Sequence, residues 1–320
     1  MRGLIPSTQL SNAEYQALPQ VGGSSLVKIY FDCPAAYKYG DNEPTKALVD
    51  GIAAHVCVLE PSVFAAQYVR GIDKADHPTA LMTTDHLKDW CKQNNLSGYS
   101  KYGKAELIKF IHDYDQDVQI FDDICAKHAA ENEGKTIVAA KDFDMISQIR
   151  RVIFEVPAYR DAFTGAQFEL SFISETAKVR WDCVTADGRI IDYKTCVSSH
   201  PLKFSRNAHD NGYWLKMALQ HDMFLQAYGE NPREVLLLAQ SKKAPYIPQG
   251  FKLTEEQLRV GRQQYTEAYD TYMWCLERNI WPAYTEEVNG RRVSNPFMDL
   301  PTPGYLAYQY DMEDIEITEA

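Results

Sequence analysis

The stretch that decides the fold is Ala177-Lys-Val-Arg-Trp-Asp-Cys-Val-Thr185, followed after a short turn by Arg189-Ile-Ile-Asp-Tyr-Lys-Thr195. Apolar and polar residues alternate in both halves, which predicts two neighbouring β-strands. Each strand nevertheless carries an acid in its interior, Asp182 in the first and Asp192 in the second. Charged residues rarely occur there unless they are paired or bind a metal. Lys194 points the same way as Asp192, because side chains two positions apart share a face.

The length of the turn decides whether the two acids meet. A two-residue turn would place Asp182 opposite Tyr193 and the two acids on opposite faces of the sheet. A three-residue turn would pair Asp182 with Asp192, and it needs a left-handed residue at its third position, which suits Gly188. We therefore favour the three-residue turn, which brings Asp182, Asp192 and Lys194 together on one face.

Outward from this pair, the periodicity predicts a mixed α/β chain. A strand is expected over 167–175, a helix over 212–228 between a cap at Asn211 and Gly229, and a buried strand over 235–240. Capping boxes at Ser11–Glu14 and Thr254–Gln257 predict a short early helix and a long one to about 279, which Trp281-Pro282 ends. Further helices are predicted over 44–59, 86–94, 104–112, 117–132 and 141–151, and loop and tail after 282.

Composition narrows the class of protein. The 320 residues are 45% hydrophobic and 24% charged, as in a globular chain, and no apolar run is long enough to predict a membrane span. Seven cysteines stand singly, which argues against a disulfide scaffold or a zinc ribbon. Together with an N-terminus that lacks the apolar core of a secretory signal, this predicts a cytoplasmic location. The net charge of −11 excludes a histone-like basic coat but allows a local basic channel.

Two carboxylates and a lysine on one strand face suit phosphodiester hydrolysis. Carboxylates bind hard cations such as Mg²⁺, which polarise the phosphoryl oxygen and lower the pKa of a bound water. The lysine can orient or deprotonate that water, or neutralise charge on the phosphorus. The alternative is a salt bridge between neighbouring strands, which has little meaning when it is exposed. Glu169 on the preceding strand and the second aspartate favour the catalytic interpretation.

The order of these residues, with Gln220 and Phe224 on the following helix, resembles the PD-(D/E)xK nuclease superfamily, although Phe224 stands where a tyrosine is usual. Over about residues 10–285 the chain resembles the exonuclease VIII (RecE-like) family of phage and prophage recombination nucleases. The segments that carry this resemblance are Leu10–Tyr15, Gly51–His55, Leu59–Pro61 with Phe64, Glu169–Ser171, Val179–Asp182, Asp192–Thr195, Gly212-Tyr213 before Gln220, and Trp281-Pro282.

The resemblance implies a PD-(D/E)xK core, with a central mixed β-sheet flanked by helices. It implies that Asp182, Asp192 and Glu169 bind metal and take part in catalysis, that Lys194 is the catalytic lysine, and that Gln220 positions the site or the DNA. The implied cofactor is Mg²⁺.

His55 is the fourth metal ligand that the resemblance implies. It lies at helical spacing with Leu48, Ile52 and Leu59, and on spacing alone a histidine on an apolar face is more often a core residue. Only the family pattern makes His55 a ligand, and an imidazole ligand would let Mn²⁺ substitute for Mg²⁺.

Residues 83–115 resemble a SAP-type helix–linker–helix module, on the segments Thr84–Trp90, Asn95–Gly98 and Gly103–Ile108. Such modules often bind duplex DNA, and Lys101 and Lys104 are the expected phosphate contacts. The alternative is a helical hairpin that only packs on the core, since acids dilute its positive charge. The other candidate DNA-binding residues are Arg180, Lys203 and Arg206.

The resemblance implies a metal-dependent 5′→3′ double-strand DNA exonuclease. By two-metal hydrolysis it would release 5′ mononucleotides and leave 3′ single-stranded tails for phage-type recombination. It further implies a homo-oligomeric ring on DNA ends and a single-strand annealing protein as partner. The alternatives are a structure- or sequence-specific endonuclease on the same fold and a non-cleaving DNA-binding protein. We expect a nuclease domain over 1–300, interrupted by the helical insertion at 83–115, and an acidic tail over 301–320.

Overall fold

The computed structural model describes residues 3–40, 46–288, 291–294 and 297–300; the predicted acidic tail lies outside the described residues. Its centre is a mixed sheet in the order β1-β5-β6-β7-β8-β9, in which β2 also pairs with β6. The strands are β1 (Leu4–Ile5), β2 (Val21–Gly22), β5 (Gln167–Ile173), β6 (Ala177–Val184), β7 (Ile190–Cys196), β8 (Val235–Ser241) and β9 (Pro248–Lys252). β7 and β8 run parallel, whereas β5–β6, β6–β7 and β8–β9 are antiparallel.

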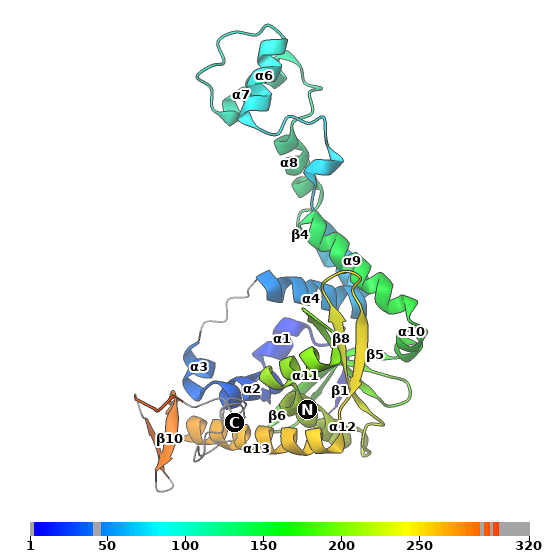
Figure 1. Ribbon diagram of the computed structural model, residues 1–320, viewed down its shortest axis with the longest axis vertical. Helices are drawn as coiled ribbons and strands as arrows, with labels where there is room; N and C mark the ends of the chain where they lie inside the picture. The colour runs from blue at the N-terminus through cyan, green and yellow to red at the C-terminus, as the bar shows by residue number, and fades with distance from the viewer. Residues whose placement is uncertain (1–2, 41–45, 289–290, 295–296, 301–320) are drawn as a thin grey trace, which may run out of the picture.

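Helices flank the sheet, as Figure 1 shows, and two apolar cores lie between the sheet and these helices. One core packs β5–β8 against α2 (Gly23–Phe31), α11 (Pro201–Asp210), α12 (Tyr213–Tyr228) and α13 (Glu255–Arg278). The other packs the sheet against α4 (Lys46–Leu59), α9 (Ala140–Glu155) and α10 (Pro157–Phe163). The short helices α1 (Asn12–Ala17), α3 (Pro34–Tyr39) and α5 (Pro61–Gln67) complete this body. The predicted α/β fold, a central mixed sheet flanked by helices, is therefore confirmed.

A helical unit stands away from the sheet at the far end of α9 (Figure 1). It contains a short 3₁₀ turn (Lys74–Asp76) and the helices α6 (Thr84–Gln93), α7 (Lys104–Tyr114) and α8 (Phe121–Glu131), and its stem pairs β3 (Tyr68–Arg70) with β4 (Thr136–Val138). Its own core includes Leu87, Leu107 and Ile111, none of which is exposed to solvent. Leu81 bridges to Ile120 outside the predicted range 83–115, so the unit extends beyond that range at both ends.

The ends of the helices agree in part with the prediction. Both predicted capping boxes form, at the starts of α1 and α13. The cap predicted at Asn211 is wrong: that side chain donates to the carbonyl of Asn207 and ends α11, which the sequence did not predict. α12 begins instead after Gly212, whose φ of 62° favours glycine. A Cβ atom there would also lie 2.7 Å from the ring of Phe31.

The region after 282, predicted as loop and tail, contains an antiparallel pair, β10 (Thr285–Val288) with β11 (Arg291–Ser294). Within the described ranges, none of the helices combines the length and the apolar character needed to cross a membrane.

Candidate active site

The turn between β6 and β7 has three residues, as the sequence predicts. The backbone N–H of Thr185 donates to the carbonyl of Arg189 (2.9 Å), and Gly188 adopts a φ of 79°. The ladder that starts at this turn pairs Cys183 with Ile191 and Val184 with Ile190. Continued by one residue, this register places Asp182 opposite Asp192.

β6 and β7 separate just beyond Asp182. In the described part of the chain, their ladder pairs lie only on the turn side of this residue, and β6 pairs farther along with β2, at Ala177 and Lys178. The start of α2 follows β2 directly, so it enters the fork between the two strands. A hollow of about 190 Å³ lies there, and the residues that line it include His55, Glu169, Asp182, Lys216 and Gln220.

Glu169 marks a break in the neighbouring strand. Its φ is 51°, a left-handed conformation that is uncommon for a non-glycine residue and that often marks functional sites. Residues two apart on a regular strand share a face. Phe168 and Cys183 nevertheless pack in one core, whereas Leu170 and Trp181 pack in the other. Asp182 lies opposite Glu169 in this register, so β5 and β6 change face together at this pair. The change directs the carboxylates of Glu169 and Asp182 into the hollow.

Three predicted ligands form one cluster. The imidazole of His55 has Nε2 3.0 Å from Oδ2 of Asp182 and Nδ1 3.5 Å from Oε1 of Glu169. One ligand atom of each residue lies within 4.8 Å of the others. Oε1 of Glu169 is buried without a hydrogen-bond partner, which a cation at this position would satisfy. Two carboxylates and an imidazole fit a divalent ion such as Mg²⁺ or Mn²⁺.

The charges in this cluster are strongly coupled. Burial and the charge of Asp182 raise the pKa of Glu169 to about 7. Burial alone would lower the pKa of His55, but the charge of Asp182 and its hydrogen bond to the imidazole raise that pKa above its usual value. Burial alone would raise the pKa of Asp182, but His55 and Lys194 lower it, so this carboxylate stays ionised. Its Oδ2 also accepts the backbone N–H of Tyr193 (2.8 Å), which fixes the carboxylate in place.

Asp192, which we predicted as a ligand, lies outside this cluster. The residue is fully buried, and the structure pairs it with two ammonium groups instead. Nζ of Lys216 lies 2.9 Å from its Oδ1, and Lys194 contacts its Oδ2. Nε2 of Gln220 is 3.5 Å from the same Oδ1. Lys194 also lies 3.7 Å from Oδ2 of Asp182 and so stands between the two acids.

Lys216 is the residue whose place in the site the sequence reasoning missed. It precedes Gln220 by four residues, which puts both side chains on one face of α12. That spacing is the signal that could have linked the two. Burial alone would lower the pKa of Lys216, but Asp192 and Asp182 raise it well above its usual value, so the ammonium stays charged.

His55 reaches the cluster because α4 packs closely on β7. A Cβ atom at Gly51 would lie only 3.5 Å from Oγ1 of Thr195, and Ala54 is buried. Ile52, predicted to share the apolar face of His55, is 46% exposed, so that part of the prediction is wrong. Gly51 faces Thr195 of β7, and the large aliphatic residues Val58 and Leu59 of the same helix pack in the core between α4 and the sheet.

The structure gives two of the predicted DNA-binding residues partners inside the protein. Arg180 lines the hollow but donates to the hydroxyl of Ser171 and the carbonyl of Leu10, each at 2.7 Å, so it holds the N-terminal segment. Lys104 pairs with Asp122 at 2.7 Å. The other three residues are exposed: Lys101 in the loop between α6 and α7 of the helical unit, and Lys203 and Arg206 on α11.

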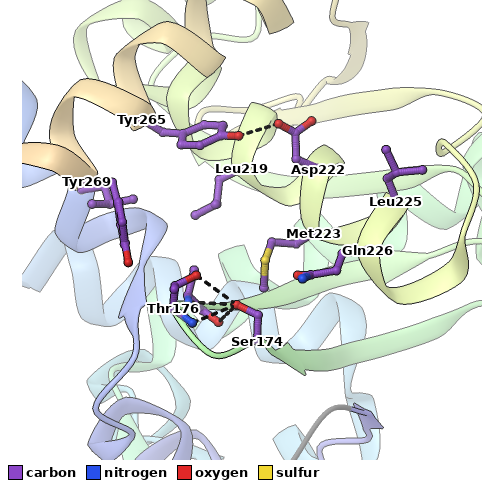
Figure 2. A pocket seen from close by; sticks show the side chains of 11 residues that line it. Ser174, Thr176, Leu219, Asp222, Met223, Leu225, Gln226, Tyr265 and Tyr269 are labelled. Atoms are coloured by element: carbon purple, nitrogen blue, oxygen red, sulfur yellow. Dashed lines mark hydrogen bonds between the residues drawn. The ribbon is translucent and has the colours of Figure 1, made fainter. Parts of the chain in front are cut away.

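A larger hollow of about 370 Å³ lies between α12, α13 and the turn from β5 to β6. Figure 2 shows its lining, in which Leu219 and Met223 face Tyr265 and Tyr269. The one acid that lines it, Asp222, accepts from Arg262 and Tyr265 and is therefore already paired. This hollow has no ligand set comparable to the His55 cluster.

A family model identifies the superfamily of this chain. The family model described as a PDDEXK-like domain of unknown function (DUF3799) matches residues 23–293. Among solved structures, the chain is similar to a candidate exonuclease from Eubacterium rectale, with 14% identity and a TM-score of 0.42 over 71% of this chain and 93% of the other. No curated protein matches. The family match confirms the PD-(D/E)xK superfamily predicted from the sequence, whereas the resemblance to the exonuclease VIII branch stays a prediction.

Proposed function

The chain belongs to the family of PDDEXK-like domains of unknown function (DUF3799), and from that premise we propose that it is a divalent-metal-dependent 5′→3′ exonuclease acting on double-stranded DNA. The observation that carries the proposal is the cluster of His55, Glu169 and Asp182 beside Lys194, in a hollow where two strands part. The released products would be 5′ mononucleotides, and the 3′ tails would serve recombination.

The chain's own residues divide the chemistry between them. His55, Glu169 and Asp182 would hold the ion, which when bound polarises the phosphoryl oxygen and supplies an activated water. Lys194, 3.7 Å from Asp182, is placed to neutralise charge that develops on the phosphate. Gln220 is 2% exposed, and its amide holds Asp192 while its Oε1 is free to accept from a ligand in the hollow.

An acid-free rim next to the site is the surface we propose for the DNA backbone. Residues 196–209 and 241–251 contain no acid in a chain of net charge −11. The two segments adjoin, because the N–H of Lys242 donates to the carbonyl of Cys196 (2.8 Å), two residues beyond Lys194. Lys203, Arg206 and Lys243 are exposed on this rim. Such a surface attracts phosphates without reading sequence.

The rim also yields a quantitative prediction. The double variant Lys242→Glu/Lys243→Glu should bind duplex DNA more weakly. The slope of log affinity against log salt concentration should become less steep by up to about 2, because each phosphate contact contributes about 0.9 to that slope. Lys252→Glu is the matched control, because that lysine lies at the other end of β9 and pairs with Glu234. Fluorescence anisotropy in Ca²⁺ over a salt series measures both quantities. Equal slopes for the two variants would remove the rim from the proposal.

The test of the function itself uses DNA labelled at either end. Linear duplex labelled at the 5′ or the 3′ end, with Mg²⁺ and with EDTA, should lose the 5′ label first as mononucleotide, and only with Mg²⁺. Covalently closed circular duplex should survive. Cutting of the circle would support an endonuclease, and binding of linear DNA without cleavage would support a non-cleaving DNA-binding protein.

The proposed partners follow from this activity. A processive exonuclease that leaves 3′ tails suits a homo-oligomeric ring around the duplex and a single-strand annealing protein that receives the tail. Light scattering with and without duplex ends would detect the ring.

A further inference from the structure

Three large aliphatic residues are exposed to solvent on the proposed DNA rim. Val197 follows the end of β7, Leu202 lies in the first turn of α11, and Ile247 directly precedes β9. They are 67%, 74% and 54% exposed, although valine, leucine and isoleucine are among the residue types most often buried. We call these three residues the apolar tip.

Hydrogen bonds bring the segments that carry the apolar tip together. The carbonyl of Ile247 accepts from the hydroxyl of Ser199 (2.8 Å) and from the N–H of Ser241 (3.1 Å). The hydroxyl of Ser241 also lies 3.4 Å from the carbonyl oxygen of Val197. Leu202 follows Ser199 by three residues. The apolar tip is therefore one small surface rather than scattered single residues, and exposed apolar side chains that gather in this way mark an interaction site.

The charge around the apolar tip indicates which partner fits it. The segments that carry the tip, 196–209 and 241–251, contain no acid, and Lys203, Arg206 and Lys243 are exposed on them. A complementary partner is therefore negatively charged and presents apolar faces between its charges. DNA has this character where its bases are open, because aliphatic side chains can pack on base faces while cations meet the phosphates.

The end of a duplex fits the apolar tip better than its side does. Inside a duplex each base face is covered by its neighbour, and aliphatic groups cannot hydrogen-bond to the base edges in the grooves. The terminal base pair, in contrast, leaves one face open. Val197 follows Lys194 by three residues, a backbone span of at most about 11 Å, which equals about three steps along a DNA strand. An end seated on the apolar tip would therefore hold the first phosphates of one strand near the His55 cluster.

We propose that the apolar tip packs on the base pair at the end of a DNA duplex, while the basic residues of the rim hold the flanking phosphates. The inference rests on the proposed nuclease function and deepens it, because it names the feature of DNA that the chain recognises. It also separates two contributions to binding. The lysines and arginine supply salt-dependent affinity for any duplex, whereas the apolar tip supplies affinity for ends that does not depend on salt.

Competition binding in Ca²⁺ tests this inference, with the fluorescence anisotropy of a labelled blunt-ended duplex as the measurement. A short and a long unlabelled fragment compete at equal base-pair concentration. The short fragment offers more ends, so it should compete better for wild type. In Leu202→Ser/Ile247→Ser the affinity for the labelled duplex should fall about tenfold, the value expected when two partly buried aliphatic contacts are lost. The two fragments should then compete equally, and the salt slope should keep its wild-type value, because the substitutions remove no charge.

Leu276→Ser is the matched control, because that leucine is 53% exposed on α13, outside the rim, and this variant should bind as wild type does. Leu202→Ser alone, at the most exposed residue of the tip, should show a smaller effect of the same sign. Circular dichroism verifies that each variant is folded, which we expect because surface substitutions rarely cost much stability.

The outcomes separate this inference from the function on which it rests. Equal competition by the two fragments for wild type, or an unchanged preference in folded Leu202→Ser/Ile247→Ser, would overturn the role of the apolar tip. A lower mass of that variant in light scattering, with its preference for ends intact, would show that the tip joins copies of this chain instead. A wild-type preference for ends that the variant loses, without cleavage of DNA in Mg²⁺, would uphold the apolar tip and overturn the proposed function.

Discussion

Replacing Lys194 with methionine removes one charge and little volume, which makes it a sharp test of the catalytic assignment. The ammonium lies 3.7 Å from Oδ2 of Asp182, so a phosphate bound at the His55 cluster lies close to it. One extra negative charge about 4 Å from an ammonium is worth about 4 kcal/mol at an effective dielectric constant of about 20. A loss of that size in the transition state corresponds to about a 10³-fold lower rate. The fold should survive, because Lys216 still pairs with Asp192.

Single-turnover cleavage of a 5′-labelled linear duplex at saturating Mg²⁺ measures the effect of Lys194→Met. Lys252→Met is the control, since that side chain is 63% exposed and pairs with Glu234. Mn²⁺ binding provides a second measurement and should be retained, because Lys194 is not a ligand. A Lys194→Met rate within a few-fold of wild type would refute the assignment of this lysine to catalysis.

Two further predictions concern stability. Burial alone would raise the pKa of Asp222, but hydrogen bonds from Arg262, His221 and Tyr265 lower it below its usual value. The network therefore stabilises the fold above about pH 4, and this stabilisation is lost as the pH falls below that value. Arg262→Leu should therefore lower the free energy of unfolding by about 1–2 kcal/mol at pH 7, after solvent screening is allowed for. Urea unfolding should show the difference between the variant and wild type shrinking towards pH 2. A difference that stays constant with pH would contradict the linkage. Gly261→Ala should destabilise the fold by about 1–3 kcal/mol, because the added Cβ atom would lie 2.2 Å from the carbonyl oxygen of Trp214. This clash outweighs the gain of about 1 kcal/mol in helix propensity. A melting temperature above that of wild type would contradict this prediction.

Local rules were enough to predict the turn and the strand register beside the site. Alternation gave the strands, and the preference of a three-residue turn for a left-handed third residue fixed the register through Gly188. That register alone brings Asp182 opposite Asp192. The capping boxes that open α1 and α13 are equally local, because each depends on residues three positions apart.

The sequence patterns could not predict features that depend on packing between segments far apart in the chain. The contact of Lys216 with Asp192 depends on which face α12 turns to the sheet, and the helix is buried on several sides. The left-handed conformation of Glu169 breaks the alternation of β5, and the sequence patterns did not predict it. Ile52 was assigned to the buried face by hydrophobicity and spacing, but the packing of α4 on the sheet leaves it 46% exposed.

The basic residues nearest the acids are committed to the protein itself. Lys194 aside, Lys178 donates to three carbonyls at the end of α1 (2.8–3.0 Å), Arg180 holds the segment before it, and Lys216 pairs with Asp192. Redirecting any of them to a phosphate would leave buried acceptors or a buried carboxylate with fewer partners, at a cost that a solvent-exposed lysine does not incur. We therefore propose that the exposed rim of α11 and the β8–β9 turn provides the affinity for the DNA backbone. Binding should accordingly weaken with salt, while the internal contacts that shape the site, being largely buried, are screened far less.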